Sequence, residues 1–419
     1  MGTTSSAADN ASTADLPEGL RRGDPDYRRA VLAMLAAGLA SFNALYCTQA
    51  MLPTLTTELG VTPTQSALTV SATTGALALA IVPASILSER FGRGRVLVAS
   101  VIAAVALGAL LPLAPGIWWL IAGRGLQGAL LAGVPAVAMT WLAEELHPDH
   151  LSRAMGVYVA GTSLGGLIGR IVPAGVLEVA SWRWALGADA LVATVFVVVI
   201  LRMLPAQRRF TRKELHVRSE FTAMVGHWRD PRLAALFITA FLVMGVFVSF
   251  YNYLGFRMID RFGLSEGLVG ALFILYLSGT WSSARAGAWA SRFGPGRVLV
   301  VMILTALAGI ALTVSGNLAV TVLGTLLFTA AFFAVHSTAS GWIGRLATSD
   351  RAEASSMYLF CYYLGSSLVG WFSGLILVRH SWTGLIVWLL AVLGVQLLIA
   401  VALTRDRIRR HRGTGSGLT

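Results

Sequence analysis

The feature that most constrains this chain is a series of apolar runs that begins near residue 29 and recurs almost to the end. A helix of about 20 residues crosses the hydrocarbon core of a bilayer, which is about 30 Å thick. Each run is long enough to do so, and we therefore predict an all-α integral membrane protein. Its twelve spans lie at about 29–51, 66–87, 96–114, 117–142, 154–178, 183–204, 233–256, 268–290, 298–316, 318–342, 354–378 and 382–404.

The composition excludes an ordinary soluble protein. Hydrophobic residues make up 56% of the chain and charged residues only 12%, whereas soluble domains carry about 25% charged residues. A soluble globule of this composition would expose large apolar patches and aggregate.

The basic residues give the orientation. If both termini are cytoplasmic, 25 of the 32 basic residues fall in inner loops and tails, four in outer loops and three within spans. This is the positive-inside pattern. We expect a protein of the bacterial cytoplasmic (inner) membrane, with the bilayer as its partner. The net charge of +12 then needs no nucleic acid to explain it.

The domain boundaries follow from one long, basic connection that separates six spans from six. We expect a disordered cytoplasmic tail at 1–28, an N-terminal half at 29–204, a cytoplasmic linker at 205–232, a C-terminal half at 233–404 and a basic cytoplasmic tail at 405–419.

The residue types that cofactors need are scarce. Lys213 is the only lysine, and it does not lie in a Walker A sequence. Cys47 and Cys361 fall inside apolar runs, and His147 and His150 are too few for a metal site. We expect no nucleotide, no metal, no other cofactor and no enzyme activity.

An internal repeat relates the two halves. Residues 90–98 read RFGRGRVLV and residues 292–300 read RFGPGRVLV, so eight of nine positions match. Both copies fall on the cytoplasmic side, so the halves are parallel. Parallel six-span halves, related by an axis along the membrane normal, describe transporters that bind substrate between the halves.

The loop after the second span carries a family resemblance. Ser85-x-x-x-Glu89-Arg90-Phe91-Gly92-Arg93-Gly94-Arg95 is similar to the signature Gly-x-x-x-Asp-Arg-x-Gly-Arg-Arg of the major facilitator superfamily. The second copy keeps Gly287, Arg292, Gly294 and Arg297 and has Ser291 in place of the acid. The resemblance covers nearly the whole chain after the tail and implies the twelve-helix major facilitator fold.

In that family the signature loop acts as a conformational latch. The resemblance implies that Glu89 and Arg90 pair at the end of the fourth span, where Glu144 and Glu145 lie. The alternative is a loop that serves only the positive-inside topology.

Two further motifs resemble those of drug–proton antiporters. In the fourth span, Arg124 and Gln127 match a motif linked to proton-coupled efflux. Arg124 could shift the proton affinity of an acid, hold an anionic group or snorkel outward. In the fifth span, Gly161, Gly165 and Gly166 resemble an antiporter motif, with Thr162 where proline is usual. Close helix packing alone would also favour these glycines.

The proton-coupling group is harder to assign. The pattern Leu45-Tyr46-x-x-Gln49-x-x-Leu52-Pro53 is similar to sugar-efflux and drug–proton antiporter relatives, but the first span lacks their carboxylate. His336 is the leading candidate because imidazole titrates near neutral pH. Asp189 is the alternative, and Arg170 is a second buried cation without a partner that the sequence identifies. Each could instead be a packing or structural residue.

Polar and aromatic residues at helical spacing predict a weakly charged pocket between the halves, suited to a neutral or amphipathic molecule. The pocket residues are Asn43, Tyr46, Gln49, Asn252, Tyr276, Tyr358 and Tyr362.

The preferred interpretation is a monomeric secondary transporter in which a proton gradient drives the efflux of small amphipathic molecules or drugs by alternating access. The alternative is an importer or facilitator of a sugar or another small metabolite. A channel or an intramembrane enzyme fits the repeat less well.

Overall fold

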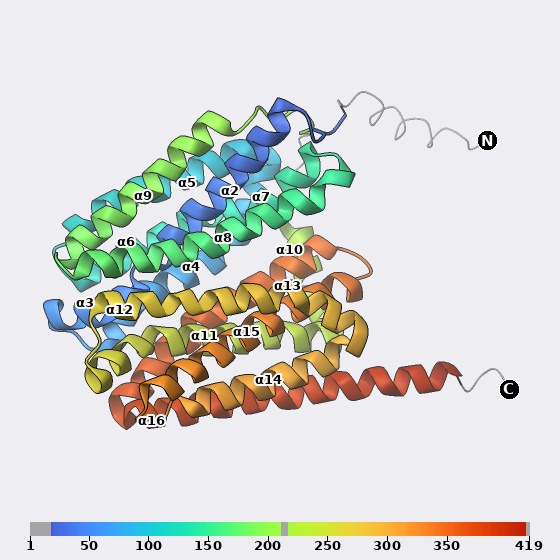
Figure 1. Cartoon of the computed structure of the whole chain (residues 1–419). Helices are drawn as coiled ribbons and strands as arrows, with labels where there is room; N and C mark the ends of the chain where they lie inside the picture. The colour runs from blue at the N-terminus through green and yellow to red at the C-terminus, as the bar shows by residue number, and fades with distance from the viewer. Residues whose placement is uncertain (1–17, 211–216, 416–419) are drawn as a thin grey trace, which may run out of the picture.

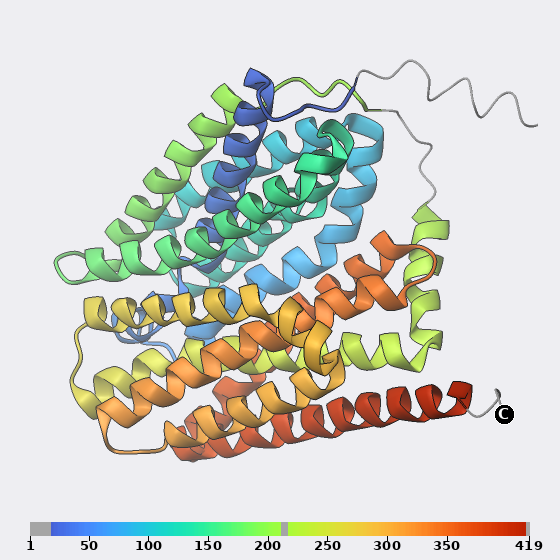
Figure 2. The ribbon, with the colours of Figure 1, turned by 45° about the vertical axis from the view of Figure 1, so that its right-hand side comes forward.

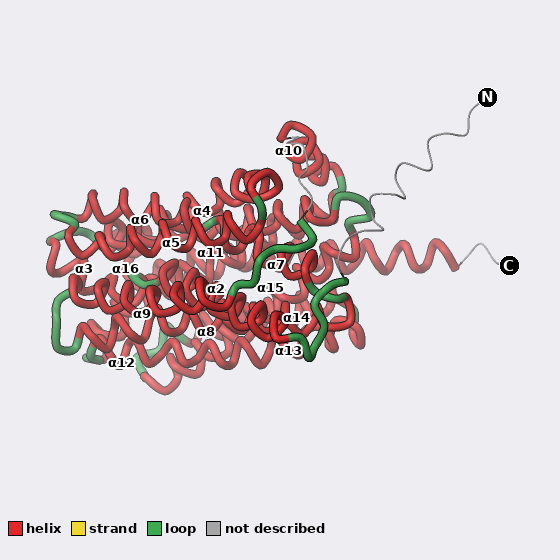
Figure 3. Tube along the Cα trace, turned by 90° about the horizontal axis from the view of Figure 1, so that it is seen from above, coloured by secondary structure: helices red, strands yellow, loops and turns green. Residues whose placement is uncertain are grey.

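The protein folds into long helices that run in roughly one direction, with the loops gathered at two ends (Figure 3). The computed structural model describes residues 18–210 and 217–415. Within these ranges there is no strand, and a single isolated bridge joins Leu20 to Leu146. The predicted all-α fold is confirmed.

The first half contains six spans, several of them broken into shorter helices. These are α2 (Pro25–Tyr46) with η1 (Gln49–Met51) and α3 (Leu52–Leu59), α4 (Pro63–Phe91), α5 (Arg93–Leu110) with η2 (Leu111–Leu113), α6 (Ile117–Leu131) with α7 (Gly133–Glu145), α8 (Pro148–Leu177) and α9 (Trp182–Met203).

The second half follows the connecting helices α10 (Val217–Gly226) and η3 (His227–Arg229). Its elements are α11 (Pro231–Phe262), α12 (Glu266–Ala271) with η4 (Leu272–Leu275) and α13 (Tyr276–Phe293), α14 (Pro295–Leu312), α15 (Leu318–Leu346) and α16 (Arg351–Gly415).

Eleven helical stretches of the described chain are long and apolar enough to cross a membrane, and the last of them is 53 residues long. Ser381 divides that stretch, since its φ of 59° and ψ of −172° are not helical. The two arms of α16 are separate helices in Figure 2. This break gives the twelve crossings that the sequence predicts.

The described part of the tail is more ordered than expected. Leu20 is buried, its amide donates to the carbonyl of Glu145 (2.8 Å), and its carbonyl accepts from His147 (3.0 Å). α2 already begins at Pro25, because proline suits the first helical turn. Residues 1–17 and 211–216 lie outside the described ranges.

The repeat is visible in the backbone. Gly92 and Gly294 each end one helix and precede the next, with φ values of 100° and 86° that only glycine adopts easily. The two Arg-Phe-Gly turns at 90–95 and 292–297 lie at one end of the molecule, which we call the RFG end. Figure 1 shows the first half above the second half, with α10 and the described ends of the chain, near residues 18 and 415, toward this same end.

Candidate functional site

The contacts between the two halves are concentrated away from the RFG end. At the opposite end, Thr54 donates to Glu266 (2.6 Å) and the amide of Gly267 donates to Glu178. Nearer the middle, Ser366 donates to Thr74 (3.2 Å) and Ser367 to the carbonyl of Ser71 (2.7 Å). Among the described residues, no hydrogen bond between the halves uses α4 beyond Thr74 or α8 before Arg170. Hydrogen bonds therefore join the two halves at the end opposite the RFG end, which we call the joined end, and not at the RFG end.

Glu178 gives the joined end a charged group. Hydrogen bonds from the Ser265 side chain and the Gly267 amide hold the pKa of this carboxyl below its ordinary value. Glu178 follows α8 in the first half, whereas Ser265 and Gly267 begin α12 in the second.

At the RFG end, the signature loop forms its ion pairs through a different arginine from the one expected. Arg93 contacts Glu89 (3.1 Å) and Glu144 (3.1 Å), and it also donates to the Ser88 hydroxyl (2.6 Å). Arg90 is exposed and lies over the Phe91 ring instead. The expected pairing through Arg90 is therefore wrong. The turn at Gly92 places Arg93, the first residue of α5, against the ends of α4 and α7.

The two acids of α7 also hold the start of the linker, which the sequence did not indicate. Gln207 donates to Glu144 (3.0 Å), and the amides of Arg208 and Arg209 donate to Glu145 (3.0 and 2.9 Å). Arg95 is exposed at the surface.

The second copy of the turn lacks this network. Arg292 lies over the Phe293 ring, Arg297 is exposed, and a Cβ at Gly287 would meet no atom within 4 Å. No ion pair joins Arg292 or Arg297 to another described side chain. Ser291, which replaces the acid of the first copy, accounts for part of this difference.

Arg124 lies on α6 and is fully buried. Its guanidinium donates to the carbonyls of Ala44 (2.6 Å) and Leu45 (2.5 Å), to the carbonyl of Thr69 (3.3 Å) and to the side chain of Gln127. Ala44 and Leu45 lie in the last turn of α2, where carbonyls lose their helical partners. Arg124 therefore braces the break in the first span.

Asp189 lies on α9 and is 4% exposed. Asn43 donates to its carboxylate (2.7 Å), and the Cys47 thiol is a second hydrogen-bonding neighbour. No ion pair joins Asp189 to Arg183 or to Arg170. Asn43 thus faces α9 within the first half, apart from the other residues expected in the pocket.

The glycines of the fifth span allow α8 to pack closely on α2. A Cβ at Gly161 or Gly165 would clash with the backbone of Leu35 or Leu39. Gly166 faces another direction, toward the guanidinium of Arg170 on its own helix.

Arg170 lies between the two halves, where it is 2% exposed. Nε donates to Gln49 (2.7 Å) and Nη1 to the carbonyl of Gly166 (2.5 Å). The guanidinium carbon lies 4.3 Å from the ring centre of Tyr46, 4.9 Å from Tyr276 and 5.0 Å from Phe273. The sequence identified this cation but not these partners.

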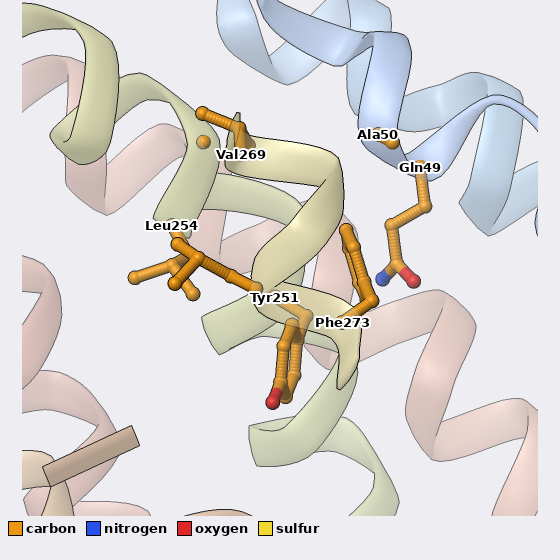
Figure 4. Close-up of a pocket in the computed structure, with 8 residues that line it drawn as sticks. Gln49, Ala50, Tyr251, Leu254, Val269 and Phe273 are labelled. Atoms are coloured by element: carbon orange, nitrogen blue, oxygen red, sulfur yellow. The ribbon is translucent and has the colours of Figure 1, made fainter. Parts of the chain in front are cut away.

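Gln49 connects this cluster to the second half. Its amide nitrogen donates to Asn252 on α11 (2.7 Å). Beside it, a small cavity is lined by Gln49, Ala50, Tyr251, Leu254, Gly255, Val269, Leu272 and Phe273 (Figure 4). The structure therefore brings together four of the expected pocket residues, Tyr46, Gln49, Asn252 and Tyr276, around Arg170.

His336 lies on α15 and contacts the remaining two expected pocket residues, Tyr358 and Tyr362, which lie on α16. Its Nδ1 is 2.9 Å from the hydroxyl of Tyr358, and its ring centre is 4.6 Å from that of Tyr362. The Phe332 ring stacks on His336 and on Phe247, whose ring centre lies 5.4 Å from that of Tyr276. Aromatic contacts therefore link the His336 cluster to the Arg170 cluster.

Comparison with known sequences points to one family. The profile of the Major Facilitator Superfamily matches residues 34–285. The chain is 37% identical to the inner membrane transport protein YnfM of Escherichia coli, over 96% of this chain and 97% of that protein. It is 36% identical to the uncharacterized MFS-type transporter YybF of Bacillus subtilis, over 92% and 96%.

Solved structures share the fold at low identity. A bacterial homologue of the human lysosomal transporter Spinster, inward-facing and unoccupied, aligns with a TM-score of 0.72 and 15% identity over 91% of this chain and 97% of the other. The peptide transporter POT, bound to alafosfalin, aligns with a TM-score of 0.76 and 13% identity over 94% and 97%. The chain is a transporter rather than an enzyme, and it belongs to the major facilitator superfamily.

Proposed function

We propose that this transporter exports small amphipathic molecules from the cytoplasm in exchange for protons, by rocking its two halves about the centre. The observation that carries the proposal is the Arg170 cluster, which contains residues of both halves and adjoins the His336 cluster. Hydrogen bonds join the halves at the end opposite the RFG end, and none does so at the RFG end among the described residues. The basic residues gathered in the loops of the RFG end support a cytoplasmic location for it. In this proposal, the end at which no hydrogen bond joins the halves faces the cytoplasm.

Export is favoured over import by the likeness of the fourth and fifth spans to antiporter motifs. A distant relative points the same way. The puromycin resistance protein pur8 of Streptomyces alboniger is 25% identical over 240 residues, which is 53% of this chain and 48% of that protein.

We assign the proton to His336. It is half-buried and contacts the titratable side chains Tyr358 and Tyr362. No charged side chain among the described residues bonds to it, so its own protonation determines the local charge. Asp189 is instead enclosed by Asn43 and Cys47, and we assign it a structural role against α2.

The test of function is transport in everted membrane vesicles, with substrates found by a growth-inhibition panel of cells with and without the protein. We expect accumulation that depends on an acidic interior. The proposal fails if no substrate accumulates while whole cells take compounds up through the protein.

The test of coupling compares His336→Gln with Asp189→Asn. His336→Gln should abolish the pH dependence of transport and preserve substrate binding, whereas Asp189→Asn should keep the pH dependence. The opposite pattern would transfer the coupling role to Asp189.

A further inference from the structure

The charge of Arg170 has no counter-ion. No carboxylate among the described residues forms an ion pair with this guanidinium, although it is almost fully buried. A charged side chain buried in a membrane protein is costly, and such groups usually face a partner or a pathway. Its two hydrogen bonds go to neutral acceptors, Gln49 and the Gly166 carbonyl, so the positive charge stays uncompensated.

Hydrogen-bond donors around Arg170 are also unused. Nη2 of Arg170 has no acceptor among the described residues. The Tyr276 hydroxyl, whose ring centre lies 4.9 Å from the guanidinium carbon, is buried and unpartnered. Buried polar groups are usually satisfied. The unused Nη2 and the Tyr276 hydroxyl therefore describe a site that lacks an acceptor, and the positive charge beside them favours an anionic one.

The surroundings define the rest of the ligand. The rings of Tyr46, Phe273 and Tyr276 enclose the guanidinium, and the small cavity beside Gln49 and Phe273 has mainly apolar walls. We propose that Arg170 is the binding site for the carboxylate of an amphipathic monocarboxylate, whose apolar body lies among these rings. This inference rests on the proposed function, since it names the substrate class of the same central site.

A matched pair of probes tests the charge requirement. The purified wild-type protein in nanodiscs is titrated with 3-phenylpropionate and 3-phenylpropanamide, and with octanoate and octanamide. We expect at least one acid to bind about tenfold or more tightly than its amide, because hydrogen bonds to charged groups are stronger than neutral ones. Equal affinity for acid and amide in both pairs overturns the proposal.

Variants assign the preference to Arg170. Arg170→Gln should remove it, and Arg285→Gln, a matched change at an exposed arginine over Trp281, should keep it. If Arg170→Gln does not fold, Tyr276→Phe tests the same site by removing only the free hydroxyl, and it should weaken the acid about threefold or more without affecting the amide. If the Arg170→Gln protein folds and still prefers the acid, the assignment is overturned. If only Tyr276→Phe can be tested, an unchanged acid preference in that variant overturns it.

Failure of this site and failure of the proposed function are distinguishable. Binding is measured without a gradient, so a carboxylate that binds through Arg170 but is not exported refutes export alone. Proton-driven export of neutral compounds, with no acid preference in binding, refutes the carboxylate site alone.

Discussion

Arg124 and Arg170 are the same residue type, both buried within spans, yet their surroundings differ in kind. Arg124 donates to three backbone carbonyls and to Gln127, and all of these partners belong to the first half. Arg170 has only two hydrogen bonds, a ring of aromatic side chains, and a partner in Gln49 that reaches the second half. The first arginine is fully engaged, whereas the second keeps a free donor.

The difference separates stability from function. A buried guanidinium that satisfies carbonyls holds the backbone, and its removal leaves those carbonyls unpaired. A buried guanidinium with unused donors at a junction between moving parts is available to a ligand. The two sites therefore respond differently to the same substitution.

The largest expected effect is on stability, from Arg124→Gln. Because the carbonyls of Ala44 and Leu45 lose their donors, we expect the free energy of unfolding to fall by about 2–5 kcal/mol. Thermal unfolding of the purified protein measures this, with Arg170→Gln as the comparison. A ligand-free Arg170→Gln protein that is less stable than the Arg124 variant would contradict the division of roles.

The next largest effect is a change of distance across the joined end, where Glu178 contacts α12. Hydrogen bonds keep the pKa of Glu178 below its ordinary value. The ionised carboxylate therefore stabilises the contact with α12 at any pH above the ordinary pKa, and this stabilisation is lost as the pH falls through the depressed pKa. We expect the joined end to open only at a pH below the ordinary pKa of a glutamate. Spin labels at Val179 and Leu268, which are both exposed, report the separation.

Glu178→Gln is the matched variant for this experiment. It should weaken closure at neutral pH and remove the response to acid. A Glu178→Gln protein whose label separation matches that of the wild type at neutral pH and changes with acid in the same way would show that Glu178 does not control this end.

The smallest effect is expected for Arg285→Gln, the third arginine within a span. Arg285 is exposed and rests on Trp281, without a hydrogen bond to another described residue. Surface substitutions of this kind change stability by about 0.5 kcal/mol or less. If Arg285→Gln lowered the free energy of unfolding as much as Arg124→Gln does in the same assay, burial and hydrogen bonding would not explain how much each arginine contributes to stability.

Much of the fold could be predicted because it depends on features that repeat along the sequence. Apolar run length gives the spans, and the duplicated Arg-Phe-Gly turn gives the parallel halves. The structure adds that Gly92 and Gly294 in these turns both have a positive φ. The break at Ser381 within α16 also matches the predicted boundary between the last two spans.

The site was less predictable because its contacts join residues that are distant in sequence. The motif identified Arg124, but only the structure shows that Ala44 and Leu45, about 80 residues away, are its acceptors. The sequence likewise gave no indication that Arg93, rather than Arg90, reaches Glu144, because the direction of a side chain after a tight turn depends on how the helices pack.

The central claim is that Arg170 holds the substrate while the halves exchange access. Its most direct test is export of a bound monocarboxylate into everted vesicles with an acidic interior, with wild type, Arg170→Gln and Arg285→Gln compared at equal protein levels. We predict that Arg170→Gln reduces the initial rate about tenfold or more and that Arg285→Gln leaves it at the wild-type value. Undiminished, gradient-dependent export by Arg170→Gln would contradict the account.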